Sequence, residues 1–339
     1  MLDIFNDDAF SVISLTGVVN KMPYLPGQVG ALNLFAEAGV ASTTIAIDER
    51  NGVLSLVKTT QRGAPGVQNT TGKGKTRSFK VPHVQLDDTI MADEVQGVRV
   101  LGSQDQTAGV QQVVNDRLSE MVLKHDLTLE NLRLGAIKGL ILDADGSTLF
   151  DLFAEFGISA NATVDFNLDA GSPASGILRK TCAGVIRTIA EKLGGVPFSG
   201  VHALCGKTFM DDLIAHKEVV ESYKGTPQAQ ELRNNGAFQV VRFGGIDFEE
   251  YRGVSSTVVG GTGVGVADTE AHFFPVGVPG LFRQWNAPAD LVETVNTIGL
   301  PRYARQYAMQ NGKGVNLETQ MNPLAICTRP EALVKGVNT

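Results

Sequence analysis

The sequence is short of cysteines, of charged side chains and of long apolar runs, and each shortage excludes a class of protein. Its three cysteines, Cys182, Cys205 and Cys327, lie far apart and form no Cys-x-x-Cys pair. That pattern fits neither a disulfide framework nor a zinc ribbon, and it favours thiols buried in a reducing cytosol. No apolar stretch approaches the roughly 18 residues of a membrane span. The first eight residues are acidic where a secretory signal would be basic.

Charge is scarce and its balance is negative. Only 19% of the 339 residues are charged, and 36 acidic against 29 basic side chains give a formal net charge of −7 with histidine neutral. Dedicated duplex-DNA binding is therefore disfavoured, because neutralisation of phosphates supplies most nonspecific affinity. Glycine, with 38 residues, is abundant. A charge-poor, glycine-rich chain suits a surface covered by other protein, because interface centres contain little charge. A monomer with an apolar surface is the alternative.

The length allows two domains or one elaborate domain, and the apolar fraction of 43% can supply a sizeable core. The first forty residues look irregular, because the proline-rich segment 23–27 interrupts them and their apolar residues have no clear period. We expect this segment to be an arm that lies across a neighbouring molecule. Residues 43–47 and 53–57 then predict two strands, joined by a polar turn at 48–52.

A long polar stretch, residues 58–80, follows these strands. It contains no acidic residue, and its basic residues are Lys58, Arg62, Lys73, Lys75, Arg77 and Lys80. Compact domains seldom carry structureless connections longer than about 12–15 residues unless these are functional or disordered. Four acidic residues come soon afterwards, at positions 87, 88, 93 and 94. The stretch is either a basic flap that reaches an acidic surface, on another copy of the chain, or a solvated loop.

Residues 107–140 carry the longest helical pattern. At about 1.5 Å per residue a helix of this length would extend roughly 50 Å. Turn residues at Gly139 and at 143–146 end it. The expected buried stripe, at steps of three and four residues, is Val110, Val114, Leu118, Met121, His125, Leu129, Leu132 and Ala136. The charged residues expected on the other faces are Arg117, Glu120, Lys124, Glu130 and Arg133.

From residue 172 onward helices and strands alternate. The pair Ser172-Pro173 predicts the start of a helix, and Gly194-Gly195 predicts its end. Its buried stripe would be Leu178, Cys182, Val185, Ile186, Ile189 and Leu193. A second helix would turn Phe209, Leu213, Val220 and Tyr223 inward. Strands are expected at 201–205, at 238–243 and 246–251 around the turn Gly244-Gly245, near 273–276, and at 321–327.

Motifs for phosphate and nucleotide binding are incomplete. Cys205-Gly-Lys-Thr208 sits between a strand and a helix, but Val201 stands where a phosphate-binding loop needs glycine. A helix start capped by Thr208 is the favoured interpretation. The glycine-rich segment 260–265 places Val266 at the third glycine of a dinucleotide fingerprint and follows a predicted hairpin, so an exposed loop is favoured.

Motifs for metals and nucleophiles are incomplete as well. The segment 143–146 begins like a calcium loop, but Ala154 takes the place of its final carboxylate, so a turn is favoured. Asp212 and His216 share a helix face as half of a metal site, and an ion pair is the more probable arrangement at this spacing. No serine elbow or nucleophilic cysteine signature occurs. We therefore predict no catalytic, cofactor or metal site, which favours a structural role.

Several segments, most specifically between about 200 and 330, resemble the lambda-like tailed-phage major capsid protein family (phage major capsid protein E). The similar segments, in order, are Ala203-Leu-Cys-Gly with Phe209, Asp212, Leu213, His216, Val219 and Tyr223 behind it; 243–253 (FGGIDFEEYRG); 272–277 (HFFPVG); 287–290 (APAD); 293–297 (ETVNT); and 299–301 (GLP).

The resemblance implies an α+β chain with the tailed-phage major capsid fold (Hong Kong 97-type). It would comprise an N-terminal arm (1–40), an extended hairpin loop (41–82), a peripheral domain with a long spine helix (83–164 and 311–339) and an axial domain (165–310). No lysine–asparagine pair can be matched to the covalent cross-links known in part of this fold.

The implied function is self-assembly, as pentamers and hexamers, into the icosahedral head shell of a virion. The shell would enclose double-stranded DNA without sequence-specific binding or a membrane, and assembly would take place in the host cytoplasm. Implied partners are a portal protein and, because the arm begins almost at Met1, a separate scaffolding protein; a decoration protein stays open. The alternatives are an encapsulin-like nanocompartment and a nucleotide-binding α/β enzyme using Lys207 and Thr208.

Overall fold

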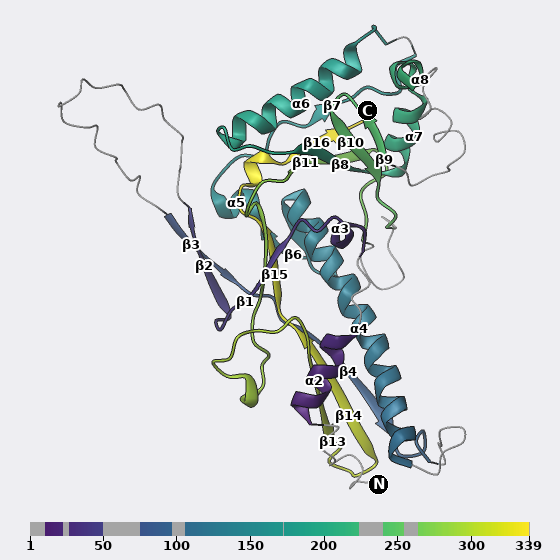
Figure 1. The fold of residues 1–339 in the computed structure, drawn as a ribbon, viewed down its shortest axis with the longest axis vertical. Coiled ribbons are helices and arrows are strands. Elements are labelled where there is room, and N and C mark those ends of the chain that lie inside the picture. Colours follow the sequence, from purple (N-terminus) through teal and green to yellow (C-terminus); the bar gives the residue numbers. More distant parts are fainter. Residues whose placement is uncertain are drawn as a thin grey trace, which may run out of the picture. The chain divides into compact units, whose positions relative to one another are not determined.

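The computed structural model describes residues 11–22, 27–49, 75–96, 106–171, 173–223, 240–253 and 264–338. Its helices are α2 (Val12–Lys21), α3 (Gln28–Ala31), α4 (Gln106–Lys138), α5 (Leu152–Phe156), α6 (Ile177–Leu193), α7 (Lys207–Ala215), α8 (Lys217–Tyr223) and the short 3-10 turns η2 (Val292–Thr294) and η3 (Pro330–Ala332) (Figure 1).

Sixteen strands accompany these helices in the described residues. They are β1 (Ala36–Gly39), β2 (Thr44–Glu49), β3 (Lys75–Lys80), β4 (Val84–Met91), β5 (Leu140–Leu142), β6 (Thr148–Asp151), β7 (Val164–Asp165), β8 (Gly200–Cys205), β9 (Val240–Phe243), β10 (Ile246–Glu250), β11 (Glu270–Val276), β12 (Phe282–Asn286), β13 (Tyr303–Ala308), β14 (Gly314–Met321), β15 (Pro323–Cys327) and β16 (Val334–Val337).

The chain forms two compact units, and each is assembled from three separate pieces of sequence. Unit 1 comprises residues 1–43, 80–133 and 283–326. Unit 2 comprises residues 44–79, 134–282 and 327–339. These boundaries do not coincide with the predicted arm, loop, peripheral and axial divisions, which remain a prediction.

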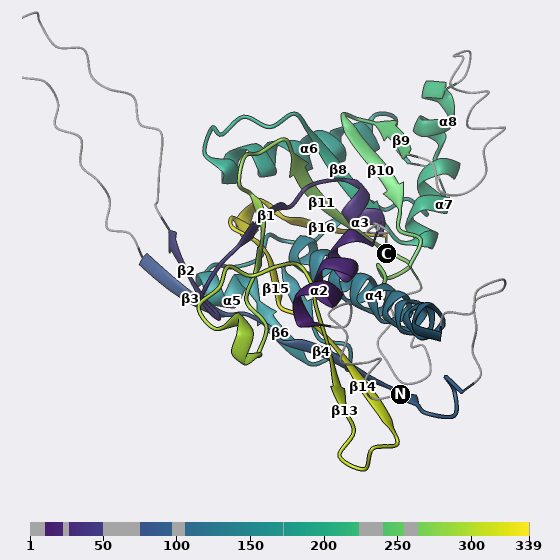
Figure 2. The same cartoon turned by 60° about the horizontal axis from the view of Figure 1, so that its bottom comes forward.

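Unit 1 contains a three-stranded antiparallel sheet in the order β13-β14-β4. In Figure 2 β13 and β14 form a long hairpin. The sheet packs with α2 and α4 around a core whose buried members include Leu15, Val114, Leu118, Ile90 and Leu317. A second sheet, β1-β12-β15, pairs β1 with β12 in parallel, with Ala36 opposite Arg283.

Helix α2 corrects the prediction that the first forty residues are irregular. Ser11 caps it, because its hydroxyl oxygen accepts a hydrogen bond from the backbone N–H of Ser14 at 3.3 Å. Leu15 and Val19 are buried within unit 1. Thr16, which interrupts the apolar pattern, is also buried and donates its hydroxyl to the carbonyl oxygen of Ala304 at 3.2 Å. This part of the segment therefore buries its apolar face in its own chain.

Helix α4 confirms the long helix, with bounds within two residues of the prediction. Every member of the predicted stripe whose side chain is described is buried, from Val114 to Ala136; the Val110 side chain lies outside the described residues. Two charged residues depart from the prediction. Glu130 and Arg133, expected on the solvated faces, are each only 4% exposed.

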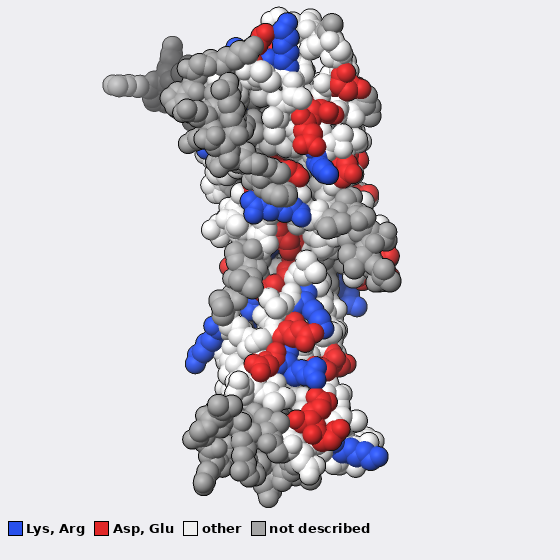
Figure 3. All heavy atoms as spheres, turned by 90° about the vertical axis from the view of Figure 1, so that its right-hand side faces the viewer, with Lys and Arg blue, Asp and Glu red and all other residues white. Residues whose placement is uncertain are grey.

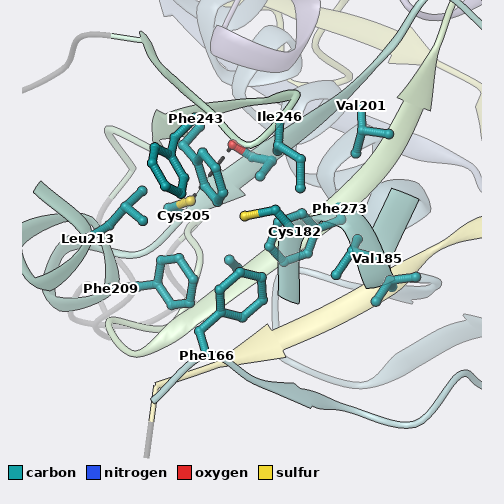
Figure 4. Packing of buried hydrophobic residues seen from close by; sticks show 14 of the residues in the cluster. Phe166, Cys182, Val185, Val201, Cys205, Phe209, Leu213, Phe243, Ile246 and Phe273 are labelled. Atoms are coloured by element: carbon teal, nitrogen blue, oxygen red, sulfur yellow. Dashed lines mark hydrogen bonds between the residues drawn. The ribbon is translucent and has the colours of Figure 1, made fainter. Parts of the chain in front are cut away.

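Unit 2 is built on a six-stranded mixed sheet in the order β7-β16-β11-β8-β10-β9. The predicted hairpin around Gly244-Gly245 is confirmed by β9 and β10, and both glycines have positive φ, 59° and 86°, as its turn requires. The core joins this sheet to α6, α7 and α8 (Figure 4). At its centre Phe166 stacks on Phe273 with ring centroids 5.2 Å apart, while Phe209 meets Phe166 edge-on at 5.3 Å.

The first predicted stripe of unit 2 is confirmed apart from Ile186, which is only partly buried; the second stripe holds only for Phe209 and Leu213, and the limits of both helices differ from the prediction. Helix α6 begins at Ile177 after Gly176, which has a φ of 85°, so the start predicted at Ser172-Pro173 is wrong. Its predicted end is correct, because Gly194 is a left-handed cap. The predicted second helix is two helices, α7 and α8, separated at His216, which has extended backbone. As a result Val219 is buried and Val220 is exposed, the reverse of what the stripe required.

One strand prediction also changes, and another cannot be followed to its partner. Strand β2 pairs with β3, while residues 53–57, the partner predicted for it, lie outside the described residues. The predicted last strand, 321–327, is divided at Asn322 into the end of β14 and β15. A further strand that was not predicted, β16, lies between β7 and β11 in the sheet of unit 2.

Candidate functional site

The predicted intersubunit residues lie in and before β3. Lys58, Arg62 and Lys73 are outside the described residues, and so is the side chain of Lys75, the first residue of β3. Arg77 and Lys80 are described, and Lys80 is exposed. The structure therefore describes the side chains of only the last two basic residues of this stretch. The docking role of the stretch stays a prediction.

Strand β3 is anchored in unit 2 through two side chains. Phe79 is 1% exposed and packs against Phe150 and Phe156, with both ring centroids 5.8 Å away. The guanidinium of Arg77 lies 5.4 Å from the Phe156 ring and donates to the carbonyl oxygens of Glu155 and Phe156. Because the last carbonyls of a helix lack internal partners, this cation completes the end of α5. Arg77 thus has a role in its own chain that the sequence pattern did not reveal.

The acidic residues that follow β3 are partly paired within unit 1. Arg117 on α4 lies 2.8 Å from Glu94 and 3.7 Å from Asp88. The hydrogen bond that Arg117 donates to Glu94, with the charge of Asp88, raises the pKa of Arg117. In Figure 3 basic and acidic side chains are interspersed over the face seen there, and no single-sign area dominates it. Two of the four acidic residues are therefore paired with a cation inside the chain, and a third, Asp87, accepts hydrogen bonds from Gln85 Nε2 at 3.0 and 3.2 Å.

A row of buried polar contacts ties α4 to distant parts of unit 1. Glu130 accepts hydrogen bonds from the backbone N–H groups of Val29 at 2.7 Å and Gly30 at 3.1 Å, which caps α3. A side chain at Gly27 would overlap the Glu130 carboxyl group. Arg133 pairs with Glu37 at 2.5 Å. Together these contacts fix residues 27–39 against α4.

One turn earlier along α4, Asp126 forms a buried ion pair with Arg302, which precedes β13. Beside it, His125 Nε2 lies 2.8 Å from the hydroxyl oxygen of Thr319. Burial, reinforced by the nearby charge of Arg302, lowers the pKa of His125 to about 4. His125 is thus neutral at physiological pH, and this end of α4 holds one buried cation beside one buried anion.

Unit 2 has a charged cluster of its own around the start of β11. The nearby His272, whose Nε2 is 3.5 Å away, together with Lys335 at 2.6 Å, lowers the pKa of Glu270 to about 2. Lys138, at the end of α4, donates to the carbonyl oxygen of Gly265, and burial lowers its pKa. The arrangement balances charge and holds the segment before β11.

The phosphate-loop motif does not form a phosphate cradle. Gly206 caps α7, so the prediction of Thr208 as the cap is wrong. Two of the backbone N–H groups at this helix start already have partners: Gly206 donates to the carbonyl oxygen of Glu270 and Phe209 to that of Asp268, both at 2.8 Å. This start of α7 is therefore joined to the segment that leads into β11.

The candidate metal motifs at Asp212 and His216 and at 143–146 also form ordinary structural contacts. Asp212 accepts a hydrogen bond from Asn338 Nδ2 at 2.6 Å, and no ion pair to His216 occurs among the described residues, so that prediction is wrong. The turn predicted at 143–146 is confirmed by the hydrogen bond from Gly146 N–H to the carbonyl oxygen of Asp143. Across the described ranges, no three potential ligand side chains gather as a metal would require.

The three thiols are buried, as predicted. Burial raises the pKa of Cys182 to about 12 and also raises the pKa values of Cys205 and Cys327. The nucleophile is the thiolate, so these protonated side chains are inert. As for membranes, none of the helices in the described part of the chain is long and apolar enough to cross one.

Comparison with known proteins identifies the family. The model of the phage major capsid protein E family matches residues 11–338. The chain is 29% identical to the major capsid protein of Pseudomonas phage KPP10, over 96% of each chain. It is 27% identical to the major capsid protein of Salmonella phage Felix O1 (isolate Felix O1-VT1), over 98% of each chain.

Solved structures show the same fold. A prophage protein of E. coli CFT073, described as a capsid protein, superposes with a TM-score of 0.56 at 12% identity, covering 97% of this chain and 99% of that one. A phage-related protein of Bordetella bronchiseptica RB50 gives a TM-score of 0.51 at 13% identity, covering 98% of each chain.

The chain belongs to the phage major capsid protein E family. It is a major capsid protein of a tailed phage, a subunit of the head shell, and it packs with copies of itself in that shell. The predicted α+β capsid fold and the predicted function are confirmed. Its contacts with other copies of the chain are therefore functional surfaces.

Proposed function

We propose that this chain acts without enzymatic activity and assembles, as pentamers and hexamers, into an icosahedral shell that encloses double-stranded DNA. Assembly takes place in the host cytoplasm, with scaffolding and portal proteins as partners. The observation that carries the proposal is the family match over residues 11–338. The net charge of −7 supports a shell that encloses DNA without binding it tightly, because phosphate neutralisation supplies most nonspecific affinity.

The energetics of such a shell favour many modest contacts. Specific stable interfaces bury about 1,200–2,000 Å² in total. The cost of association leaves each contact weak enough to correct errors, while closure multiplies the contacts and makes the shell durable.

Electron microscopy of the purified chain, expressed with and without a scaffolding protein, tests this proposal. We expect closed particles of uniform size. A chain that stays monomeric at high concentration with scaffold supplied would contradict it. The nucleic-acid content of heads from infected cells separates a DNA-filled head from a nanocompartment that encloses protein.

We further propose that the basic stretch 58–80 docks on an acidic surface of a neighbouring copy. Charge reversal at Lys73, Lys75 and Arg77 would then impair shell formation. Because Arg77 also completes α5 in its own chain, the sharper variant is Lys73→Glu with Lys75→Glu and Arg77 retained. The matched control is Lys73→Arg with Lys75→Arg, which keeps both charges. We expect shells from the control only, and normal shells from the reversed variant would refute the docking.

A further inference from the structure

The connection between β12 and β13 exposes an unusual amount of apolar surface. Within nine residues, four aliphatic side chains point into solvent: Val292 is 87% exposed, Ile298 69%, Val295 64% and Leu300 44%. We call residues 291–300 the apolar loop. Single exposed aliphatic residues are ordinary on a monomer, but a group of this kind marks an interaction surface.

The apolar loop is held firmly in this conformation by its polar groups. The Thr294 hydroxyl, which is buried, donates to the carbonyl oxygen of Ala289 at 2.7 Å. The backbone N–H of Leu300 donates to the Tyr303 hydroxyl at 2.8 Å, and that of Gly299 donates to Val40 at 2.9 Å. Gly299 lies so close to Asn286 that a side chain would overlap its carbonyl group. These hydrogen bonds and the close packing of Gly299 therefore hold the backbone that carries the exposed side chains.

An inward cluster fixes the base of the apolar loop at the same time. Leu291, Ala289 and Tyr303 are buried together, with Val12 of α2 packed against them. These buried side chains fix the loop in its own chain. The four exposed aliphatic side chains are not part of this cluster. What they contribute must come from a contact with another molecule.

The charges around the apolar loop favour another copy of the same chain as that molecule. Between residues 287 and 301 the charged residues are Asp290 and Glu293, both acidic and exposed. The chain itself supplies the complement, since its stretch 58–80 has six basic residues and no acidic one. A capsid subunit also packs with copies of itself in the shell.

We infer that the apolar loop is a self-association surface, covered by a second copy of this chain in the assembled shell. The inference rests on the proposed assembly and adds the residues that one of its contacts uses. Val295 and Ile298 lie at the centre of the loop and carry the contact, while Asp290 and Glu293 form a polar rim that orients it.

Thiol labelling tests this directly, because the native cysteines are buried. Val295→Cys and Ile298→Cys, made separately, each give one reactive thiol in the free subunit. In closed particles that contain no other protein, we expect maleimide labelling to slow at least about tenfold, because the reagent then reaches the thiol only when the contact opens. Equal labelling rates in free subunits and particles would overturn the inference. Protection that appears only in particles holding a second protein would overturn it as well.

A paired substitution provides the second test. Ile298→Asp places a charge in the contact, and Ile298→Val keeps the site apolar. We expect the aspartate variant to raise the subunit concentration needed for assembly at least about tenfold, since burying an unpaired charge is costly, while the valine variant assembles normally. Assembly of Ile298→Asp at the wild-type concentration would overturn the inference. Failure of the wild-type chain to form particles would instead overturn the proposed function.

Discussion

The two units bury their interiors with different chemistry. Unit 2 is held by a large apolar cluster of aliphatic and aromatic side chains that includes Cys182 and Cys205, with Phe248 and Phe273 fully buried. Unit 1 has an apolar core as well, but along α4 it also buries Asp126, Glu130 and Arg133, each 4–5% exposed. Apolar packing tolerates changes that keep volume, whereas a buried charge depends on the particular groups that pair with it. The two units should therefore fail for different reasons.

The sequence offers a separate probe for each unit. Its single tryptophan, Trp285 on β12, belongs to unit 1. The three cysteines all belong to unit 2 and are buried there. Tryptophan fluorescence in urea therefore reports on unit 1, and the rate of thiol labelling reports on unit 2, in the unassembled subunit.

The largest effect is expected from removing one partner of the buried pair in unit 1. Arg302→Met leaves Asp126 charged and without its guanidinium, and we expect a loss of about 3–5 kcal/mol in the unfolding free energy read by Trp285. Adding Asp126→Leu should restore most of the loss, because an apolar pair can replace a buried ion pair. A double variant as unstable as Arg302→Met would show that packing, rather than charge, dominates this site.

A slightly smaller effect is expected from a cavity in unit 2. Leu213, on α7, is fully buried in the apolar cluster. Leu213→Ala should cost about 3 kcal/mol and speed thiol labelling, with the Trp285 transition unchanged. Leu213→Met, which roughly keeps volume, is the control. If both probes shift together in the alanine variant, the units unfold as one and the comparison fails.

The pH dependence of unit 1 should reveal His125. Its pKa is about 4 in the folded chain against an ordinary 6.5, so between these values the unfolded chain binds more protons. Stability of unit 1 should therefore fall as pH is lowered, by about 2 kcal/mol between pH 7 and pH 5 from this group. The measurement is the Trp285 transition at both pH values, in wild type and in His125→Asn. The variant should lose this part of the pH dependence; an unchanged slope would contradict the assignment.

The smallest effect is expected from the exposed pair on α4. Lys124 and Glu120 lie 3.0 Å apart, and each side chain is 59% exposed. Solvent and side-chain entropy offset such a contact, so Lys124→Ala should leave the urea transition of Trp285 where it is. If Lys124→Ala lowered the unfolding free energy as much as Arg302→Met, exposed and buried ion pairs in this unit would contribute equally to stability, which contradicts the prediction.

The difference between the units also explains which parts of the fold could be predicted. Apolar stripes repeat along one segment, so the stripes of α4 and α6 and the β9–β10 hairpin were recognisable. The burial of Glu130 was not, because its partners are backbone groups at Val29 and Gly30, about a hundred positions away in the chain. Helix α2 was missed for the same reason. Thr16 can be buried because its hydroxyl donates to the carbonyl oxygen of Ala304, which is distant in the sequence.

The candidate site was predictable only in part. Segments similar to capsid proteins identified the family, and one of them, 293–297, lies in the apolar loop. Its surface role could not be predicted, because an aliphatic residue such as Val292 is equally compatible with a core position until the fold places it outside. The structural role of Arg77 depends on carbonyl groups of α5 that come 78 and 79 positions later in the chain.

The order in which strands join the sheets has a consequence during synthesis. Strand β14 sits between β13 and β4, and β16 sits between β11 and β7, so each sheet needs a strand from the last thirty residues or so of the chain. A chain that stops before residue 314 lacks a strand inside the sheets of both units. We expect such truncated products to fold incompletely and to be excluded from a growing head.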